Sequence, residues 1–238
     1  MSTLVAFQNA NDSADGSTEM TPLEVRLPPL LSVIAGMVDL TGFLTLGHIF
    51  AAHITGNLVV AAAAAVAGGP HNVAQALAIP VFMLALAAVW MIAQVSHQRG
   101  LALARLLLWV QFLLLAAVLI FSTIARPSAD PHGLTAGIAV MIAVCAMACQ
   151  YALLRLAIPG AMSTAVMTGN LTNTVLSLMD SLSRRPLLPS DPGRLTRSLY
   201  LLLGFLLGCV VAAVAVSLVG DWAWSLPTTL AALAIAVR

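Results

Sequence analysis

Charge is scarce in this sequence, and lysine is missing from it. Only 8% of the 238 residues are charged, all ten basic residues are arginines, and no acidic residue stands between Asp39 and Asp130. A soluble domain typically has about 25% charged residues, so a globular core with a wet surface is excluded. The net charge of +1 and the lack of a basic cluster give no phosphate-binding surface. Nucleic acid is therefore not expected as a partner.

Cysteine is also rare, and the common catalytic motifs are missing. Cys145 and Cys149 lie one helical turn apart in one apolar run, and Cys209 lies in another. Buried in apolar segments, they are typical of small packing residues, and no histidine or carboxylate stands nearby to complete a metal site. The chain has no nucleophile elbow, zinc-protease motif, P-loop or dinucleotide fingerprint. We expect no cofactor, no metal and no enzymatic activity, with an intramembrane enzyme as the weakest hypothesis.

What the sequence has instead is long apolar stretches. Hydrophobic residues make up 61% of the chain, and the mean hydropathy is +1.00. Runs near the length of about 20 residues that crosses a bilayer recur along it. This pattern predicts an all-α, polytopic transmembrane helix bundle of about seven to eight spans, with the lipid bilayer as its surroundings. The expected spans are 30–46, 49–67, 75–95, 101–124, 134–154, 162–182, 198–219 and a short last segment, 222–237.

Polar and proline-rich stretches divide the chain. Residues 1–27 read as a flexible polar tail, 28–125 as a first membrane repeat, 126–133 as a linker and 134–238 as a second repeat. With eight spans and a cytoplasmic N-terminus, the inner side would hold seven arginines and the outer side three. The positive-inside rule therefore favours a cytoplasmic N-terminus in a plasma (inner) membrane protein.

A short motif occurs twice. Thr55-Gly56-Asn57 and Thr168-Gly169-Asn170 each follow a glycine, Gly47 or Gly160, by eight residues. We interpret this as a duplicated helical hairpin, with a tight turn at Gly47-His48 in the first copy. Four spans in each half would make the repeats parallel, related by an axis along the membrane normal.

The polar residues of the two hairpins have similar predicted depths. Asp39 and Asn57 lie eight and ten residues from Gly47, and Gln150 and Asn170 each lie ten residues from Gly160. At 1.5 Å per residue these distances correspond to roughly 12–15 Å, near the middle of the bilayer. A carboxylate at that depth costs about 2.5–3.5 kcal/mol to insert, so it indicates a function or a polar partner.

Two interpretations stay open. In the first, the protein is a small-solute or ion transporter with a mid-membrane site, and a proton path from His53 to Asp39 is conceivable. Its candidate residues for binding the solute or ion are Asp39, Thr55, Asn57, Gln150, Thr168 and Asn170. In the second, it is a non-transporting scaffold or partner-binding protein whose motifs only pack helices. The candidate packing residues are Gly36, Gly47, Ala52, Gly56, Gly160, Ala165, Gly169, Gly204 and Gly208. The pair Gly204 and Gly208 fits packing within the bundle better than a dimer face, and a homo-oligomer stays open.

The first hairpin resembles a known family. The stretch GMVDLTGFLTLGHIFAAHITGNLV is similar to the signature of the YoaK family of bacterial membrane proteins, with Gly36, Asp39, Phe50 and Thr55-Gly56-Asn57 at the matching positions. The later triplet matches the second motif of that family. The resemblance covers the chain from about Leu30 onward. It implies a bacterial inner-membrane protein without an established activity, and it transfers no catalytic residue.

Overall fold

The computed structural model describes residues 22–67, 73–98, 102–158, 161–164, 166–183 and 193–236, and this part of the chain contains helices and no strand. The all-helical class predicted from the sequence is therefore confirmed. The α-helices are α2 (Pro22–Thr45), α3 (Ile54–Ala67), α4 (Val73–Gln98), α5 (Leu103–Ala125), α6 (Leu134–Ala157), α7 (Met167–Leu182), α8 (Arg194–Val219) and α9 (Ser225–Ala236), with 3-10 turns η1 (Pro127–Ala129) and η2 (Gly220–Trp224). The predicted N-terminal tail lies outside the described residues up to residue 21.

Five stretches are long and apolar enough to cross a membrane: Arg26–Thr45, Val73–Ser96, Leu103–Ala125, Leu134–Ala157 and Arg194–Ala236. The chain thus has the composition of a multi-pass integral membrane protein. Within the bundle, 67% of the α2 span and 72% of the α6 span are buried, against 11% of the α4 span. The two helices that carry Asp39 and Gln150 are therefore the central ones, and the others surround them.

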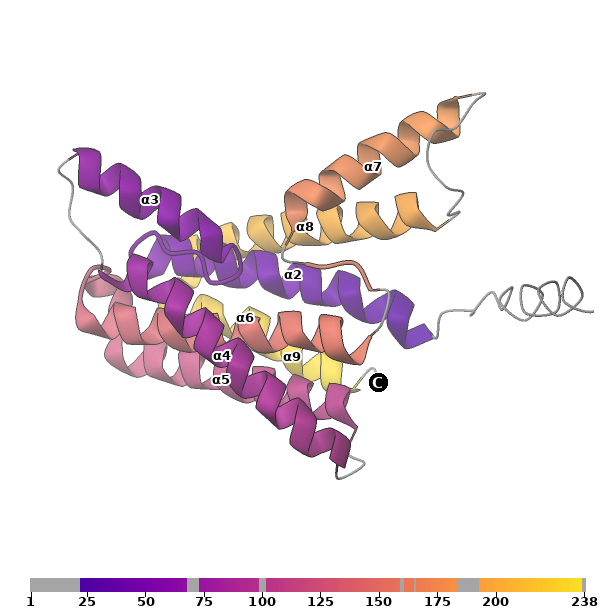
Figure 1. The fold of residues 1–238 in the computed structure, drawn as a ribbon. Helices are drawn as coiled ribbons and strands as arrows, with labels where there is room; N and C mark the ends of the chain where they lie inside the picture. The colour runs from indigo at the N-terminus through magenta and orange to yellow at the C-terminus, as the bar shows by residue number, and fades with distance from the viewer. Residues whose placement is uncertain are drawn as a thin grey trace, which may run out of the picture.

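The helices pair in a pattern that relates the two halves of the chain. In Figure 1, α2 runs from right to left and α6 from left to right. Helix α2 packs on α8 as α6 packs on α4, and α3 packs on α4 as α7 packs on α8. Likewise α5 packs on α6 as α9 packs on α2. Exchanging α2–α5 with α6–α9 thus maps each of these contacts onto another one.

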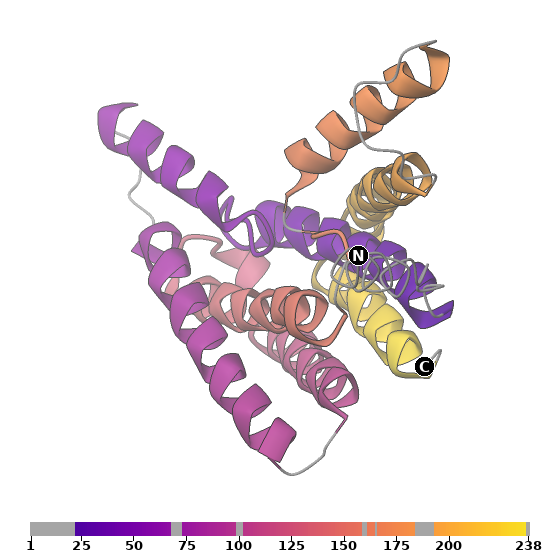
Figure 2. The ribbon, with the colours of Figure 1, turned by 45° about the vertical axis from the view of Figure 1, so that its right-hand side comes forward.

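Helices α3 and α7 differ from the predicted spans because both begin inside the bundle. They have 14 and 16 residues, shorter than the expected segments 49–67 and 162–182. Helix α2 ends at Thr45, and Gly47 and His48 take left-handed backbone angles. The chain then stays non-helical until Ile54. Figures 1 and 2 show α3 and α7 leaning away from the bundle on the same side, toward opposite ends of it. Gly160 and Ala165 lie outside the described residues.

The crossing of α2 and α8 brings two backbones into direct contact. A Cβ on Gly36 would meet the carbonyl oxygen of Phe205, and a Cβ on Gly208 would meet that of Val33. Ser32 Oγ donates a hydrogen bond of 2.6 Å to the Leu201 carbonyl on the same contact. Glycine is required here because any larger side chain would push the two helices apart, as in other close helix pairs in membranes.

Candidate functional site

Asp39 of α2 lies against the non-helical segment that leads into α3. Asp39 is 3% exposed. Its Oδ1 accepts hydrogen bonds from the backbone N–H groups of Ala52 (2.6 Å) and His53 (3.3 Å). The other oxygen, Oδ2, lies 2.5 Å from His53 Nδ1. The N–H groups just before a helix attract negative charge. The buried carboxylate therefore has two backbone donors and one ionisable partner.

Each asparagine of the repeated triplet forms side-chain hydrogen bonds with the backbone of the residue seven positions before it. Asn57 Nδ2 donates to the Phe50 carbonyl (2.7 Å), and its Oδ1 accepts from the Phe50 N–H (2.8 Å). Asn170 Nδ2 donates to the Ser163 carbonyl (2.9 Å) at the same separation in sequence. In both copies the amide satisfies backbone groups that no helix can pair, as a buried non-helical segment requires.

Gln150 and Tyr151 of α6 connect the two halves. Gln150 Nε2 donates to the Leu31 carbonyl of α2 (2.9 Å) and to Thr164 Oγ1 (3.2 Å), and its oxygen accepts from Gln111 Nε2 (2.8 Å). Tyr151 donates its hydroxyl proton to the Ala52 carbonyl (2.8 Å). Gln150 thus binds the segment before α7 as Asp39 binds the segment before α3, with a neutral side chain in place of the carboxylate.

Both contacts lie near the middle of the bundle. Leu31, bound by Gln150, and Asp39 stand on either side of the centre of the 20-residue span Arg26–Thr45. They are eight residues, or roughly 12 Å, apart along α2. The two contacts are therefore at different levels along α2, which connects the two motifs, and the equal depth of Asp39 and Gln150 stays a prediction.

The remaining predicted residues lie at the starts of α3 and α7. Thr55 and Thr168 are exposed. A Cβ on Gly56 would meet the ring of Phe50, and one on Gly169 would meet the side chain of Val166. These two glycines therefore make room for their own preceding segments, whereas Gly36, Gly204 and Gly208 lie at the crossing of α2 and α8. Ala52 contributes both backbone groups to the site, its N–H to Asp39 and its carbonyl to Tyr151.

Three contributors were missed in the sequence. Tyr151 and Gln111 carry the connection between the halves, and Phe205 of α8 lies edge-on to the His53 ring with centroids 5.0 Å apart. Only Gln111 could have been recognised from the sequence, because a polar side chain within an apolar span normally has a specific partner.

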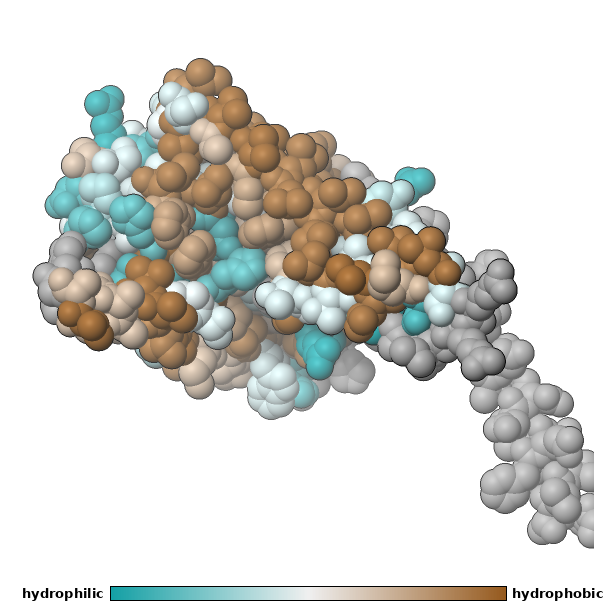
Figure 3. All heavy atoms as spheres, turned by 90° about the horizontal axis from the view of Figure 1, so that it is seen from above, coloured by the Kyte–Doolittle hydropathy of each residue, from teal (hydrophilic) through white to brown (hydrophobic). Residues whose placement is uncertain are grey.

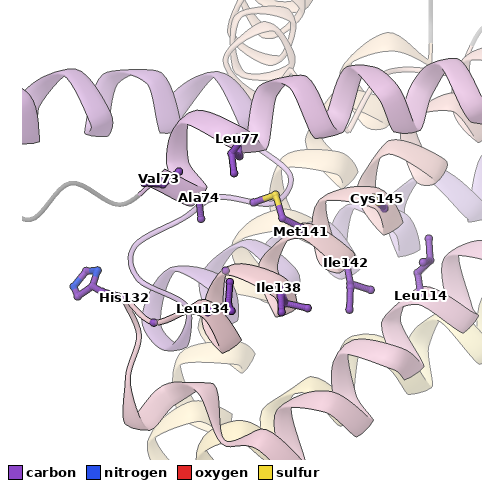
Figure 4. A pocket seen from close by; sticks show the side chains of 12 residues that line it. Val73, Ala74, Leu77, Leu114, His132, Leu134, Ile138, Met141, Ile142 and Cys145 are labelled. Atoms are coloured by element: carbon purple, nitrogen blue, oxygen red, sulfur yellow. The ribbon is translucent and has the colours of Figure 1, made fainter.

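A separate cavity opens between α4, α5 and the first turns of α6. It has a volume of about 640 Å³ and is lined mainly by aliphatic side chains such as Leu77, Leu114 and Met141, with His132 at one end (Figure 4). None of the predicted site residues lines it. Its lining is almost wholly apolar, so this cavity is distinct from the polar site around Asp39.

Comparisons with curated proteins and with solved structures gave no match. The model of one protein family matches residues 27–237, which is nearly the whole described bundle. The matched region includes both Thr-Gly-Asn triplets together with Asp39 and Gln150. The chain therefore belongs to the family described as protein of unknown function (DUF1275).

Proposed function

We propose that this protein is a proton-linked transporter of a small solute or ion, with Asp39 and His53 as its proton-binding pair. The observation that supports it most is the buried Asp39 carboxylate beside His53, held by backbone N–H groups within the membrane span. Ionisable groups inside a membrane span are rare, and they commonly mark ion pathways or proton relays. We assign Thr55, Asn57, Gln150, Thr168 and Asn170 to the same path.

We also propose that the two halves are inverted repeats, unlike the parallel repeats expected from four spans each. Helices α3 and α7 begin in the bundle and return toward the end from which their segments entered (Figure 1). If they do not cross, each half crosses three times and the second half is inverted, in agreement with the opposite directions of α2 and α6. Inverted repeats with broken helices at mid-membrane are a common transporter plan.

The arginines support a cytoplasmic N-terminus. Arg26, Arg105, Arg155, Arg194 and Arg197 stand at helix ends on the side where α2 begins. Among the described arginines, Arg126 alone stands at the opposite end. We therefore propose that the side where α2 begins faces the cytoplasm, by the positive-inside rule. The bacterial inner membrane and the YoaK-like assignment are compatible with the family match and remain part of the proposal.

The experiment is a proton-flux measurement in liposomes that contain the purified protein and a pH-sensitive dye. A pH gradient is imposed, and a potassium ionophore balances the charge. We expect the wild type to dissipate the gradient faster than empty liposomes, and Asp39→Asn to fall to the empty level. Asp221→Asn is the matched control, because it makes the same change at the end of the bundle, where Asp221 binds Ser128. Equal fluxes for wild type and empty liposomes would contradict the proton-linked proposal.

The scaffold interpretation has an observation in its favour as well. At Gly36, near the middle of α2, the backbone of α8 at Phe205 packs directly against α2 and leaves no room for a side chain between the two helices. Under this alternative, Asp39 and the asparagines only satisfy the backbone of the two non-helical segments. The scaffold alternative predicts no proton flux in the wild type or in any variant. It also predicts a loss of folded protein when Gly36 or Gly208, at the crossing of α2 and α8, is replaced by a larger residue.

A further inference from the structure

Helices α3 and α7 are attached to the bundle in different ways. Along α7, Asn173 accepts a hydrogen bond from Arg194 of α8 (2.7 Å). Thr174 donates one to Ser198 of the same helix (2.9 Å). Helix α3 has no side chains for such bonds beyond its start, because residues 58–67 are all leucine, valine or alanine. Helix α3 is therefore held mainly at its start, whereas α7 is also bound to α8 farther along.

The contact that holds the start of α3 contains an ionisable pair. Asp39 accepts from two backbone N–H groups just before α3, and its other oxygen contacts His53 Nδ1. The segment before α7 is bound by the neutral amides of Gln150 and Asn170 instead. An amide does not titrate, whereas histidine changes its charge between pH 5 and pH 8. Of the two attachments, only that of α3 can therefore respond to protons in this range.

The hydrogen bonds around Asp39 depend on how many protons the pair carries. An ionised carboxylate only accepts hydrogen bonds, and N–H donors face both of its oxygens when His53 Nδ1 is protonated. A single added proton can be shared, because a neutral His53 can accept the O–H of a protonated Asp39. When each residue has its own proton, the carboxyl group faces donors at both oxygens and also carries an O–H. At least one of the bonds that hold the start of α3 is then broken.

The surroundings of the pair add no second charge and leave it partly open. Tyr151 of α6 and Cys209 of α8 lie close enough to Asp39 to interact with it electrostatically, and both are ordinarily neutral between pH 5 and pH 8. Within the described residues, the ion-pair partner of Asp39 is His53, whose side chain is 29% exposed. Figure 3, seen from the side of α3 and α7, shows hydrophilic surface between hydrophobic areas. The exposure of His53 gives protons access to the pair.

We propose that binding of protons to both Asp39 and His53 loosens the attachment of α3 and lets this helix tilt, while α7 stays in place. The inference rests on the proton-binding pair of the proposed function, and it names the element that this pair moves. Tyr151 is the expected pivot, because its hydroxyl still binds the Ala52 carbonyl (2.8 Å) when the pair is protonated. The two shorter helices then have unequal roles, although the same triplet begins both.

The test is a measurement of distances between two spin labels by pulsed electron paramagnetic resonance, in lipid nanodiscs at pH 8 and at pH 5. The native cysteines are first replaced by alanine. One labelled protein carries Ala62→Cys on α3 and Ile120→Cys on α5. The matched control carries Val175→Cys on α7 with the same Ile120→Cys, so it reports α7 from the same reference point. All three positions are exposed.

A further control removes the titration itself. The double variant Asp39→Asn with His53→Gln places two neutral amides at the pair, as Gln111 and Gln150 form a neutral pair elsewhere in the bundle (2.8 Å). We expect a second population of α3 distances to appear at pH 5 with the native pair. The α7 distances should be the same at both pH values. In the double variant the α3 distances should also be the same at both.

Three results would overturn the proposal: α3 distances that do not change with pH, an equal change in α7, or a change in α3 that persists in the double variant. The proton-flux measurement separates this inference from the proposed function. A tilting α3 in a protein without proton flux would leave the inference standing while the transport proposal fails. Proton flux with α3 fixed at pH 5 would do the reverse.

Discussion

The side-chain amide of Asn57 pairs with both backbone groups of Phe50, its nitrogen donating to the carbonyl and its oxygen accepting from the N–H. When the N–H and the carbonyl of one residue both pair with a single other residue, that partner is usually the backbone of a neighbouring strand. Asn57 therefore acts as a short piece of backbone and closes the loop between Phe50 and Asn57, which are seven residues apart in sequence. Asn170 places its amide nitrogen on Ser163 in the second copy, so the repeated triplet is explained first as a device that stabilises a non-helical segment.

The first prediction concerns these asparagines. Asn57→Ala leaves the part-buried N–H and carbonyl of Phe50 without this partner, and an unpaired group costs up to about 1–3 kcal/mol. We expect a loss of about 2–4 kcal/mol from Asn57→Ala, and a loss of the same sign from Asn170→Ala. Thermal unfolding in detergent, followed by tryptophan fluorescence, measures both. An unchanged midpoint in Asn57→Ala would show that this segment does not depend on the amide.

The second prediction concerns the crossing of α2 and α8. In Gly36→Ala and Gly208→Ala, the new Cβ would collide with a backbone oxygen of the other helix, that of Phe205 or of Val33. Because backbone cannot rotate away, the helices must separate, and we expect each variant to unfold several degrees below the wild type. Gly137→Ala is the matched control, since its Cβ would lie 3.7 Å from Ala74 Cβ in ordinary contact. A control that destabilises as much as Gly36→Ala would contradict this account.

The third prediction concerns the connection between the halves. Tyr151→Phe removes one hydrogen bond to the Ala52 carbonyl, and bonds of this kind are worth roughly 0.6–1.7 kcal/mol in membrane proteins. Gln150→Leu has a larger effect, because it leaves the Leu31 carbonyl, Thr164 and Gln111 without this partner. Unfolding in a mild denaturing detergent should therefore rank Gln150→Leu below Tyr151→Phe. The reverse order would mean that Gln150 is replaceable by packing.

Composition and hydrophobic run length predicted the helical class and most helix positions, because only a helix satisfies its own backbone within lipid. The equal depth of Asp39 and Gln150, which was counted from the two turns, stays a prediction, because their contacts lie eight residues apart along α2. The starts of α3 and α7 could not be read in this way. The residues between His48 and Ile54 are apolar, so hydropathy counts them as part of a span, although Asp39, Asn57 and Tyr151 hold them in a non-helical form. The bonds that decide this come from residues far away in the sequence.

The same difference changes the symmetry. Counting Ile54–Ala67 and Met167–Leu182 as full spans gives four crossings per half and parallel repeats. If these shorter helices do not cross, each half has three crossings and the repeats are inverted, as we propose. The recurrence of the triplet was visible in sequence, but the direction of the second copy depends on whether a short helix crosses. Tyr151 was missed for a related reason, since a tyrosine in an apolar run resembles an interface anchor until its partner is known.

The last prediction separates the structural part of Asp39 from a role in proton binding. Asp39→Asn keeps an oxygen that can accept from the Ala52 and His53 N–H groups, and it removes an ionisable group that is costly to bury. Asp39→Leu leaves both N–H groups unpaired, so it should cost about 2–4 kcal/mol of stability. We therefore expect Asp39→Asn to unfold near the wild-type temperature and Asp39→Leu well below it. If Asp39→Asn folds and keeps the wild-type proton flux, the carboxylate serves only as an acceptor for the segment before α3, and the proton-binding role proposed for Asp39 and His53 fails. If it folds and loses the flux, the loss belongs to the ionisable group itself, because the hydrogen bonds to that segment are still made.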